Sequence, residues 1–385
     1  MNPQPANPHP ATPTSAIGTA KGGACTVSVV IKTLNEEANV AAAIESALRA
    51  VHALGGEVVL ADSCSTDDTI KIASAYPIRI VQLADPAERS CGIGPQLGFQ
   101  HTLGEYVYLL DGDMELIPGF LERALAFLAQ HPEVAGVGGL AIETNQESLE
   151  FLERAQRKEP HRAPGAVDRL DAGGLYRRMA IQEVGYLSDR NLHSYEEFDL
   201  AVRLRARGWK LRRVPIDAIT HRGHDMPPYQ LLMRRWRSGY VCGMGEMVRS
   251  AMGQRWMRLV WRDQRELRLY LAVLGWWAVL LSTPLWPASW PLRAAAFALL
   301  ALLPFAVMSL RKRSVVRGVH SVISWCFNAA GLVRGYLRPR RPAHEPIASR
   351  VLREPGDPAP AAMPTANDNA IGQRLRPLPP WPQRS

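Results

Sequence analysis

Short apolar segments that end in polar or acidic residues recur along the first third of the chain. This recurrence constrains the fold more than any other feature of the sequence. Residues 27–31, 57–61, 78–83 and 106–110 are rich in β-branched and apolar side chains, as expected of strands buried on both faces. The segments between them have helical spacing, so strands and helices alternate. We therefore predict an α/β fold with a mostly parallel sheet and helices on both faces.

Polar clusters occupy the same place after three of these strands. Asn35 and Glu36 follow the first strand, Asp62 follows the second, and Asp111 and Asp113 follow the fourth. In parallel sheets, ligands bind beyond the carboxyl ends of the strands. Each single cluster has an alternative explanation, because Asp and Asn also make good turns and helix caps. Three clusters at equivalent positions predict an active site at this edge of the sheet.

Two later segments are apolar and long enough to cross a membrane as helices. Residues 269–287 and 294–310 carry almost no charge, and at about 1.5 Å per residue each covers roughly the 30 Å of a hydrocarbon core. The linker between them carries only Arg293, whereas basic residues crowd both outer flanks. Positive charge accumulates on the cytoplasmic side, so we predict a transmembrane hairpin with both ends, and the α/β domain, in the cytoplasm. A buried hairpin of a soluble protein is the alternative.

The net charge of +9 is unevenly distributed, and its distribution bears on the partners. Residues 222–341 contain 19 Lys and Arg against 4 Asp and Glu, and this basic block includes both apolar segments. This block therefore predicts that membrane lipids are partners of the protein and that nucleic acid is not. The five cysteines are scattered without metal-ligand spacing. Their pattern argues against a disulfide framework or a structural zinc site and fits a reducing compartment.

These observations divide the chain into six regions. We predict disordered tails at residues 1–24 and 339–385, which are poor in large apolar side chains and rich in proline. Residues 25–225 form the α/β domain and residues 269–310 the hairpin. Residues 226–268 are predicted to be membrane-proximal amphipathic helices. Residues 311–338 are predicted to be an interfacial helix, because a third crossing would export the arginines at its end.

The motifs of the α/β region resemble those of the family 2 glycosyltransferases, which have a GT-A nucleotide-sugar fold. The resemblance covers about half of the chain, from residue 27 to about residue 224. It rests on several motifs in order, namely Val30-Ile31-Lys32-Thr33-Leu34-Asn35-Glu36-Glu37, Asp62-Ser63-Cys64-Ser65-Thr66-Asp67-Asp68-Thr69, Asp111-Gly112-Asp113, Gly173-Gly174-Leu175-Tyr176-Arg177-Arg178, Glu196-Glu197-Phe198-Asp199-Leu200 and the later His221.

The resemblance implies a metal-dependent, inverting glycosyltransferase and assigns roles to individual residues. The nucleotide-sugar donor is expected to contact residues from three strand ends, namely Lys32, Thr33, Leu34, Glu36, Asp62 and Asp111. A divalent metal, Mg²⁺ or Mn²⁺, is expected on Asp111, Asp113 and His221. The general base that deprotonates the acceptor hydroxyl is expected to be Glu197, with Glu196 and Asp199 as alternatives.

The chemistry of sugar transfer explains why these residue types are needed. The departing nucleoside diphosphate gains negative charge, and the hard cations that stabilise such charge prefer carboxylate oxygens. Asp111 and Asp113, one residue apart at a strand end, can face one site together. His221 would add a nitrogen ligand that suits Mn²⁺ as well as Mg²⁺, although a lone histidine is often structural. Asp62 can accept a hydrogen bond from a base imide N–H, which suits uracil or thymine better than cytosine.

The sequence departs from the family pattern at several positions. Lys32 stands where proline is frequent, and Leu34 where an aromatic residue is frequent, which leaves the identity of the base open. Glu197 replaces an aspartate and is one methylene longer. Pro95-Gln96 replaces an Arg-Asn pair, so that Arg89 becomes a candidate phosphate contact.

We therefore expect a membrane-tethered glycosyltransferase that moves a sugar from a nucleotide-sugar, with a UDP-sugar favoured, to a lipid-linked or polysaccharide acceptor. Single additions are favoured over polymerisation, because one hairpin provides little material for a channel and Leu232 stands where processive synthases carry glutamine before Arg-Trp. One alternative is a sugar-phosphate nucleotidyltransferase, which would want a glycine-rich phosphate loop after the first strand. The other is a non-catalytic membrane scaffold of the same fold.

Overall fold

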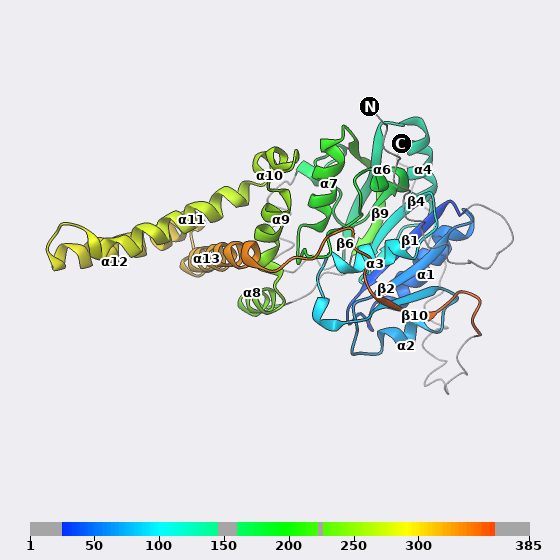
Figure 1. Ribbon diagram of the computed structural model, residues 1–385, viewed down its shortest axis with the longest axis horizontal. Coiled ribbons are helices and arrows are strands. Elements are labelled where there is room, and N and C mark those ends of the chain that lie inside the picture. The colour runs from blue at the N-terminus through cyan, green and yellow to red at the C-terminus, as the bar shows by residue number, and fades with distance from the viewer. Residues whose placement is uncertain (1–24, 145–159, 222–225, 359–385) are drawn as a thin grey trace, which may run out of the picture.

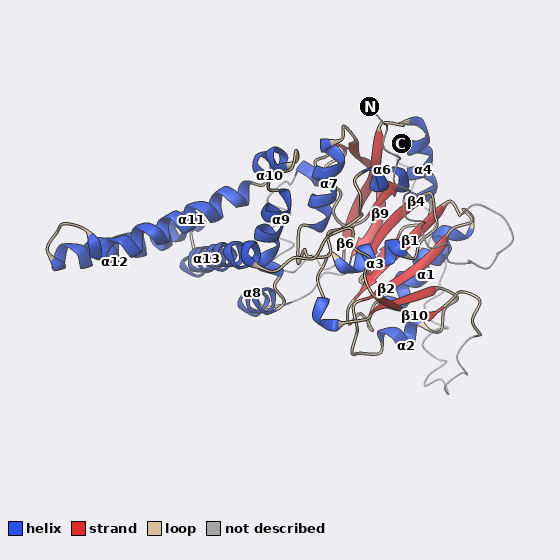
Figure 2. Ribbon diagram, viewed as in Figure 1, coloured by secondary structure: helices blue, strands red, loops and turns tan. Residues whose placement is uncertain are grey.

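The computed structural model describes residues 25–144, 160–221 and 226–358, and the sheet at its centre is mixed. Ten strands pair in the order β10-β3-β2-β1-β4-β8-β6-β9-β5, with β7 on β9 (Figure 2). The strands are β1 (Val27–Thr33), β2 (Glu57–Asp62), β3 (Arg79–Leu83), β4 (Tyr106–Asp111), β5 (Met114–Leu116), β6 (Val134–Glu143), β7 (Gly165–Ala166), β8 (Gly174–Arg177), β9 (Lys210–His221) and β10 (Ser349–Arg353).

The first four strands are parallel to one another, as predicted. Strands β6 and β9 also pair in parallel, whereas β8 lies antiparallel between β4 and β6, and β5, β7 and β10 are antiparallel to their neighbours, so the sheet is mixed. The sequence pattern predicts no strand beyond residue 113. Strand β8 has only four residues, too few to show a period.

Helices cover both faces of the sheet. They are α1 (Val40–His52), α2 (Thr69–Ala73), α3 (Ile93–Gln100), α4 (Phe120–Gln130), α6 (Arg178–Glu183) and α7 (Glu196–Ala206), with short 3₁₀ turns η1 (Pro86–Glu88) and η2 (Pro160–Arg162). Strand β1 shows how the two layers form: Val29 and Ile31 pack with α1 in one core, whereas Val30 packs with α3 in the other. Successive side chains of a strand point to opposite faces, and burying each of these apolar groups contributes roughly 1.5–3 kcal/mol.

The second half of the chain forms a helical region beside α7. It contains α8 (Pro228–Arg237), α9 (Gly243–Ala251), α10 (Met257–Asp263), α11 (Arg265–Ser282), α12 (Trp290–Lys312) and α13 (Val315–Leu337), with η3 (Tyr240–Cys242) and η4 (Thr283–Leu285). A third apolar core joins this region to the α/β domain, because Phe198 and Val202 of α7 pack there with residues of α9, α11 and α13. Helix α7 is therefore enclosed by the sheet on one side and by the helical region on the other.

Helices α11 and α12 extend away from the rest of the molecule as a hairpin, whereas α13 lies between the hairpin and the α/β domain (Figure 1). Residues Arg265–Leu285 and Trp290–Lys312 are long and apolar enough to cross a membrane, with mean hydropathies of 1.3 and 1.9. Only 22% and 6% of their most apolar windows are buried, so the described residues do not cover them as they would the core helices of a soluble protein. The helical hairpin expected from the sequence is confirmed.

The C-terminal region also differs from the sequence-based expectation. Residues 339–385 were expected to be disordered, yet residues 349–353 form β10, which pairs antiparallel with β3 at the edge of the sheet. Ile347, just before it, is only 3% exposed and packs in the core that contains Val30. The physical reason is that a single edge strand needs few apolar residues of its own when the sheet already exists. Residues 359–385, and the tail predicted at 1–24, lie outside the described residues.

Candidate active site

Five strands that run in the same direction bring polar residues to one edge of the sheet. Strands β1, β2, β4, β6 and β9 end at Thr33, Asp62, Asp111, Glu143 and His221. This is the edge that the sequence predicts as the ligand-binding edge. Four of the five residues have a carboxylate or imidazole side chain, so the edge gathers acid–base and metal-binding groups.

A single lysine lies among three carboxylates at this edge. The Nζ atom of Lys32 is 3.0 Å from Oδ1 of Asp111, 3.3 Å from Oε1 of Glu196 and 3.9 Å from Oε1 of Glu197. Asp111 ends β4, whereas both glutamates begin α7, some 85 residues later in the sequence. Acidic residues from separate segments of the chain thus meet at one site, and the ammonium of Lys32 lies between their carboxylates.

The charges in this cluster shift one another's proton affinity. Burial lowers the pKa of Lys32, but Asp111, Glu196 and Glu197 outweigh burial, and the pKa is raised well above its ordinary value. Burial and the neighbouring charge of Glu196 raise the pKa of Glu197, and the Lys32 ammonium opposes the rise. Burial likewise raises the pKa of Asp111, and Lys32 lowers it. Lys32 therefore stays charged and keeps the carboxylates closer to their ionised form.

The two adjacent glutamates are held differently. The side chain of Glu196 is 10% exposed and accepts a hydrogen bond from Lys32 Nζ, whereas the carboxylate of Glu197 lies farther from the ammonium and its side chain is 28% exposed. Glu197 is therefore the more accessible of the two, and its own pKa is raised. These properties suit a group that exchanges a proton with a substrate.

A second cluster lies beside the first and involves Asp113. The Nε2 atom of His221 is 3.4 Å from Oδ2 of Asp113, and its Nδ1 atom is 2.6 Å from Oε2 of Glu143. Hydrogen bonding to Asp113 and then to Glu143 raises the pKa of His221 to about 10. Glu143 was not among the residues predicted from the sequence. The available signal was the same as elsewhere, an acid at the end of an apolar strand.

The predicted metal ligands Asp111, Asp113 and His221 are not brought together as one set. Asp113 faces His221, whereas Asp111 faces Lys32. Within residues 25–144, 160–221 and 226–358 no three His, Cys, Asp or Glu side chains are arranged to hold a metal ion. The Asp113–His221 pair, a carboxylate and an imidazole facing each other, still fits two ligands of a Mg²⁺ or Mn²⁺ ion. The remaining ligands would have to come from substrate and water.

The residues predicted to contact the nucleotide lie at the ends of β1, β2 and β4 and in the loop after β1. Asp62 is fully buried, and its carboxylate accepts hydrogen bonds from Thr33 Oγ1, Ser65 N and Gln82 Nε2 at 3.3, 2.9 and 3.0 Å. Asp62 therefore organises its own loop and has little capacity left for a base. Arg89 donates to the carbonyl oxygens of Ser63 and Cys64 and so stabilises the same loop, instead of presenting itself to a phosphate.

Glu36 and Leu34 of the first loop lie in different surroundings. Burial raises the pKa of Glu36 to about 7, and Asp113 and Asp111 add to the rise, so Glu36 faces the acidic edge. A Cβ atom on Gly112, between the two aspartates, would come within 2.8 Å of Glu36 Cγ, which shows how closely the two loops approach. Leu34 is 44% exposed.

Three residues that border these clusters adopt a left-handed backbone conformation although they are not glycine. Asn35, Cys64 and Tyr195 have φ angles of 59°, 62° and 70°. Such conformations cost on the order of 1–3 kcal/mol each and are concentrated at functional sites in proteins. Tyr195 directly precedes Glu196, so the acidic pair begins at a point where the surroundings impose the backbone geometry.

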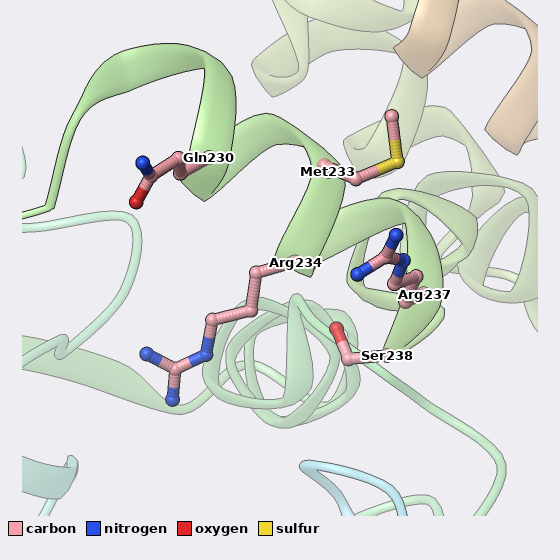
Figure 3. Close-up of a pocket in the computed structure, with 5 residues that line it drawn as sticks. All are labelled: Gln230, Met233, Arg234, Arg237 and Ser238. Atoms are coloured by element: carbon pink, nitrogen blue, oxygen red, sulfur yellow. The ribbon is translucent and has the colours of Figure 1, made fainter.

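An open depression of about 630 Å³ lies elsewhere, along α8 (Figure 3). Gln230, Met233, Arg234, Arg237 and Ser238 line it, and all five are exposed residues of one helical segment. None of them was predicted as a site residue. The depression holds no acid–base pair, so the chemistry is better placed at the sheet edge.

The chain is similar to known glycosyltransferases over part of its length. Residues 28–185 match the sequence profile described as "Glycosyl transferase family 2". The putative glycosyltransferase EpsE of Bacillus subtilis (strain 168) is 29% identical over 196 residues, which cover 48% of this chain and 68% of EpsE. Glucomannan 4-beta-mannosyltransferase 7 of Arabidopsis thaliana is 25% identical over 255 residues, which cover 60% of this chain and 44% of the plant protein. The chain thus spans less than half of that plant relative.

A solved structure shows the same fold. The mannosyltransferase PcManGT from Pyrobaculum calidifontis, solved in complex with GDP-Man and Mn²⁺, superimposes with a TM-score of 0.53 at 17% sequence identity. The match covers 81% of this chain and 87% of that protein. The GT-A fold expected from the sequence motifs is confirmed.

Proposed function

We propose that this chain, whose residues 28–185 match the family 2 glycosyltransferase profile, transfers a sugar from a nucleotide-sugar donor to an acceptor hydroxyl at a membrane surface. One observation carries the proposal. Asp111, Glu196 and Glu197 gather around Lys32, next to the Asp113–His221 pair, at the edge of the sheet where such folds bind ligands. A purely structural domain has no need for three carboxylates around one cation at an open edge.

The donor diphosphate is proposed to bind near Asp113 and His221. A divalent cation bound there would stabilise the negative charge of the departing nucleoside diphosphate. The complex of PcManGT with GDP-Man and Mn²⁺ supports this assignment by analogy. We favour a UDP-sugar as donor, and the mannosyltransferases among the relatives make GDP-mannose the donor to test beside it.

Glu197 is proposed to be the general base. Its carboxylate removes the proton from the acceptor hydroxyl, and the oxygen forms a bond to the anomeric carbon. At the same time the bond from that carbon to the diphosphate oxygen breaks, and the nucleoside diphosphate leaves with the electron pair. One in-line displacement inverts the configuration, so no covalent sugar–enzyme intermediate is needed. Lys32 donates its hydrogen bond to Glu196, whereas the Glu197 carboxylate lies farther from the ammonium, at 3.9 Å.

The hairpin is proposed to tether this site to the cytoplasmic face of a membrane, close to a lipid-linked or polysaccharide acceptor. Its length and exposed apolar surface support insertion, and the basic flanks support the cytoplasmic orientation. Arg234 and Arg237 on the exposed side of α8 suit contact with anionic headgroups (Figure 3). Tethering would raise the local concentration of such an acceptor and favour the addition of single sugars.

The proposal is tested on the detergent-solubilised full chain with UDP-glucose, UDP-GlcNAc and GDP-mannose, with and without Mn²⁺. Release of nucleoside diphosphate and the mass of the product are measured. Glu197→Gln should reduce transfer by about 10²–10⁴-fold, the usual contribution of a general base. Glu122→Gln, an exposed acid on α4, is the control and should leave transfer unchanged.

Three outcomes would contradict the proposal. Release of pyrophosphate would indicate a nucleotidyltransferase. An absence of binding by UDP and GDP in calorimetry, with and without Mn²⁺, would indicate a non-catalytic scaffold. Full transfer activity in the Glu197→Gln variant would exclude Glu197 as the base.

A further inference from the structure

The loop that leads into the acidic helix is bound by a segment that follows the membrane hairpin. We call residues 188–195 the pre-α7 loop and residues 338–358 the C-terminal segment. Asp189 of the loop is fully buried and forms an ion pair with Arg340. The same guanidinium donates a hydrogen bond of 2.7 Å to the carbonyl oxygen of Glu246 in α9. Arg340 thus joins the pre-α7 loop to the helical region.

Neighbouring residues of the loop are bound in the same way. Asn191 exchanges two hydrogen bonds of 2.9 Å with the backbone of Arg341, one from its side-chain amide to the carbonyl oxygen and one to its side-chain oxygen from the backbone N–H. Arg190 donates to the carbonyl oxygens of Glu345 and Pro346 at 3.2 and 3.3 Å. These contacts leave the loop little freedom to move away from the C-terminal segment.

Glu246 forms a third connection through its buried carboxylate. It is 1% exposed, accepts the backbone N–H of His193 at 2.9 Å, and lies 3.2 Å from Nη1 of Arg338. The His193 ring nitrogen Nδ1 is 2.9 Å from Glu246 Oε1. Arg338 and Arg340 therefore neutralise the charges of two buried acids, Glu246 and Asp189. Asp189 lies near the start of the loop, and Glu246 contacts the loop near its end, at His193.

The C-terminal segment is itself anchored at both ends. It begins at the end of α13 and continues into β10, which pairs with β3. Between them, Ile347 exchanges backbone hydrogen bonds of 2.9 and 3.2 Å with the side chain of Gln100 in α3. The segment therefore forms a fixed support between the helical region and the far edge of the sheet.

The loop needs such a support because it ends in an unfavourable conformation. Tyr195 has a φ of 70°, and Glu196 and Glu197 follow it directly. A tyrosine adopts this conformation only when its surroundings impose it. The direction in which α7 starts, and with it the position of the Glu197 carboxylate, is thus set by how the loop is held.

We propose that Arg340, assisted by Arg338, is a positioning residue for Glu197. The inference rests on the proposed function, because it assigns Arg340 a role in the transfer reaction. It places part of the active-site machinery outside residues 28–185, the part matched by the family profile. A misplacement of a reacting group by about 1 Å costs about 10²-fold in rate, so loss of the Arg340 contacts should be visible in turnover.

The test compares four variants of the full chain in detergent, in each case measuring kcat, the donor KM and the melting temperature. Arg340→Met should lower kcat by about 10²-fold and change the donor KM by less than about twofold, because the donor loops lie elsewhere. Arg340→Lys keeps the charge and should recover part of kcat. Arg350→Met is the control, since Arg350 is exposed on β10 and has no ion pair with a described residue; it should behave as wild type.

A double variant separates positioning from stability. In Asp189→Asn/Arg340→Met no buried charge is left without a partner, so the melting temperature should return toward the wild-type value. The loop would still lack its arginine, so kcat should stay low. Recovery of kcat together with the melting temperature would overturn the proposal, and so would an Arg340→Met enzyme with wild-type kcat.

Amide hydrogen exchange measures how firmly the pre-α7 loop is held, and it requires no substrate. The amides of residues 188–197 should exchange faster in Arg340→Met than in wild type or Arg350→Met. Unchanged exchange would contradict the positioning role by itself. Absence of transfer by the wild-type chain, with the expected change in exchange, would count against the proposed function alone.

Discussion

Lys32 offers the sharpest test of the site's electrostatics. Its ammonium faces Asp111, Glu196 and Glu197 within 3.9 Å, and its side chain is 21% exposed. The substitution Lys32→Met keeps the length of the side chain and removes the charge. Three carboxylates then face one another without their shared cation. We expect the variant to be less stable than wild type, and more so at high pH than at low pH.

The size of the effect follows from the burial of the partners. Removing one partner of a fully buried ion pair costs about 3–5 kcal/mol, whereas exposed pairs contribute about 0–1 kcal/mol. The side chains of Asp111, Glu196 and Glu197 are 36%, 10% and 28% exposed, between these limits. We therefore expect a loss of about 2 kcal/mol at neutral pH. For a domain of this size that corresponds to about 4–8 °C in melting temperature.

The pH dependence follows from the direction of the pKa shifts. Burial already raises the pKa values of Glu197 and Asp111, and Lys32 opposes both rises. Without Lys32 these carboxyl groups keep protons in the folded protein that the unfolded chain has released. Stability then falls as pH rises. The difference in melting temperature between wild type and Lys32→Met should therefore be larger at pH 8 than at pH 5.

The assay is thermal unfolding of the full chain in detergent with EDTA present, so that no added cation replaces the lost charge. Lys71→Met is the matched control, because Lys71 pairs with Asp68 at 3.0 Å on the surface, with side chains 59% and 60% exposed. It should shift the melting temperature by less than about 2 °C at either pH. Equal melting of Lys32→Met and Lys71→Met, or a deficit that does not grow between pH 5 and pH 8, would refute the reasoning.

Three further outcomes are expected. Glu143→Gln, which removes the carboxylate that orients His221, should weaken activation by Mn²⁺ about 10–100-fold in a metal titration, with little change at saturating metal. In a plot of kcat/KM against pH, activity should fall on the acid side at a pH above the ordinary carboxylate range. The reason is that the pKa of Glu197 is raised and only its ionised form accepts a proton. A fall near pH 4 would contradict the assignment of Glu197 as the base. Arg203→Met should cost about 3–5 kcal/mol in thermal unfolding, because the Arg203–Asp199 pair is 2.8 Å long and its side chains are 1% and 0% exposed; a stable variant would contradict the importance of that pair.

The sequence predicts those parts of the fold that depend on local pattern. Strands 27–33 and 57–62 are apolar, short and followed by polar residues, and both the strands and their common carboxyl edge were predictable. The pairing of β8 between β4 and β6 was not predictable, because a four-residue strand has no measurable period. Its position is decided by the packing of Leu175 and Tyr176 on opposite faces of a sheet that already exists.

The grouping of the acids at the site was only partly predictable. Spacing alone suggests that Asp111 and Asp113 face one site, since alternate residues of a strand share a face. However, β4 ends at Asp111, and Gly112 begins the turn into β5. Met114 of β5 pairs with His221 of β9, so the turn delivers Asp113 to the histidine and leaves Asp111 beside Lys32. The turn at Gly112, between the end of β4 and the start of β5, thus sends the two aspartates of the motif toward different partners.

The candidate site residues are distributed over two parts of the chain. The loops proposed to bind the nucleotide and both aspartates lie within residues 28–185, whereas Glu197, His221 and Arg340 lie beyond this range. Helix α7 packs against α9, α11 and α13 on the face opposite the sheet, and the segment that leaves α13 holds the loop before Glu197. If the hairpin lies in the bilayer, the base and a membrane-bound acceptor are positioned by the same set of helices. An acceptor held in a fixed orientation relative to these helices loses less orientational freedom when it reacts. Such alignment before the reaction accelerates two-substrate reactions strongly.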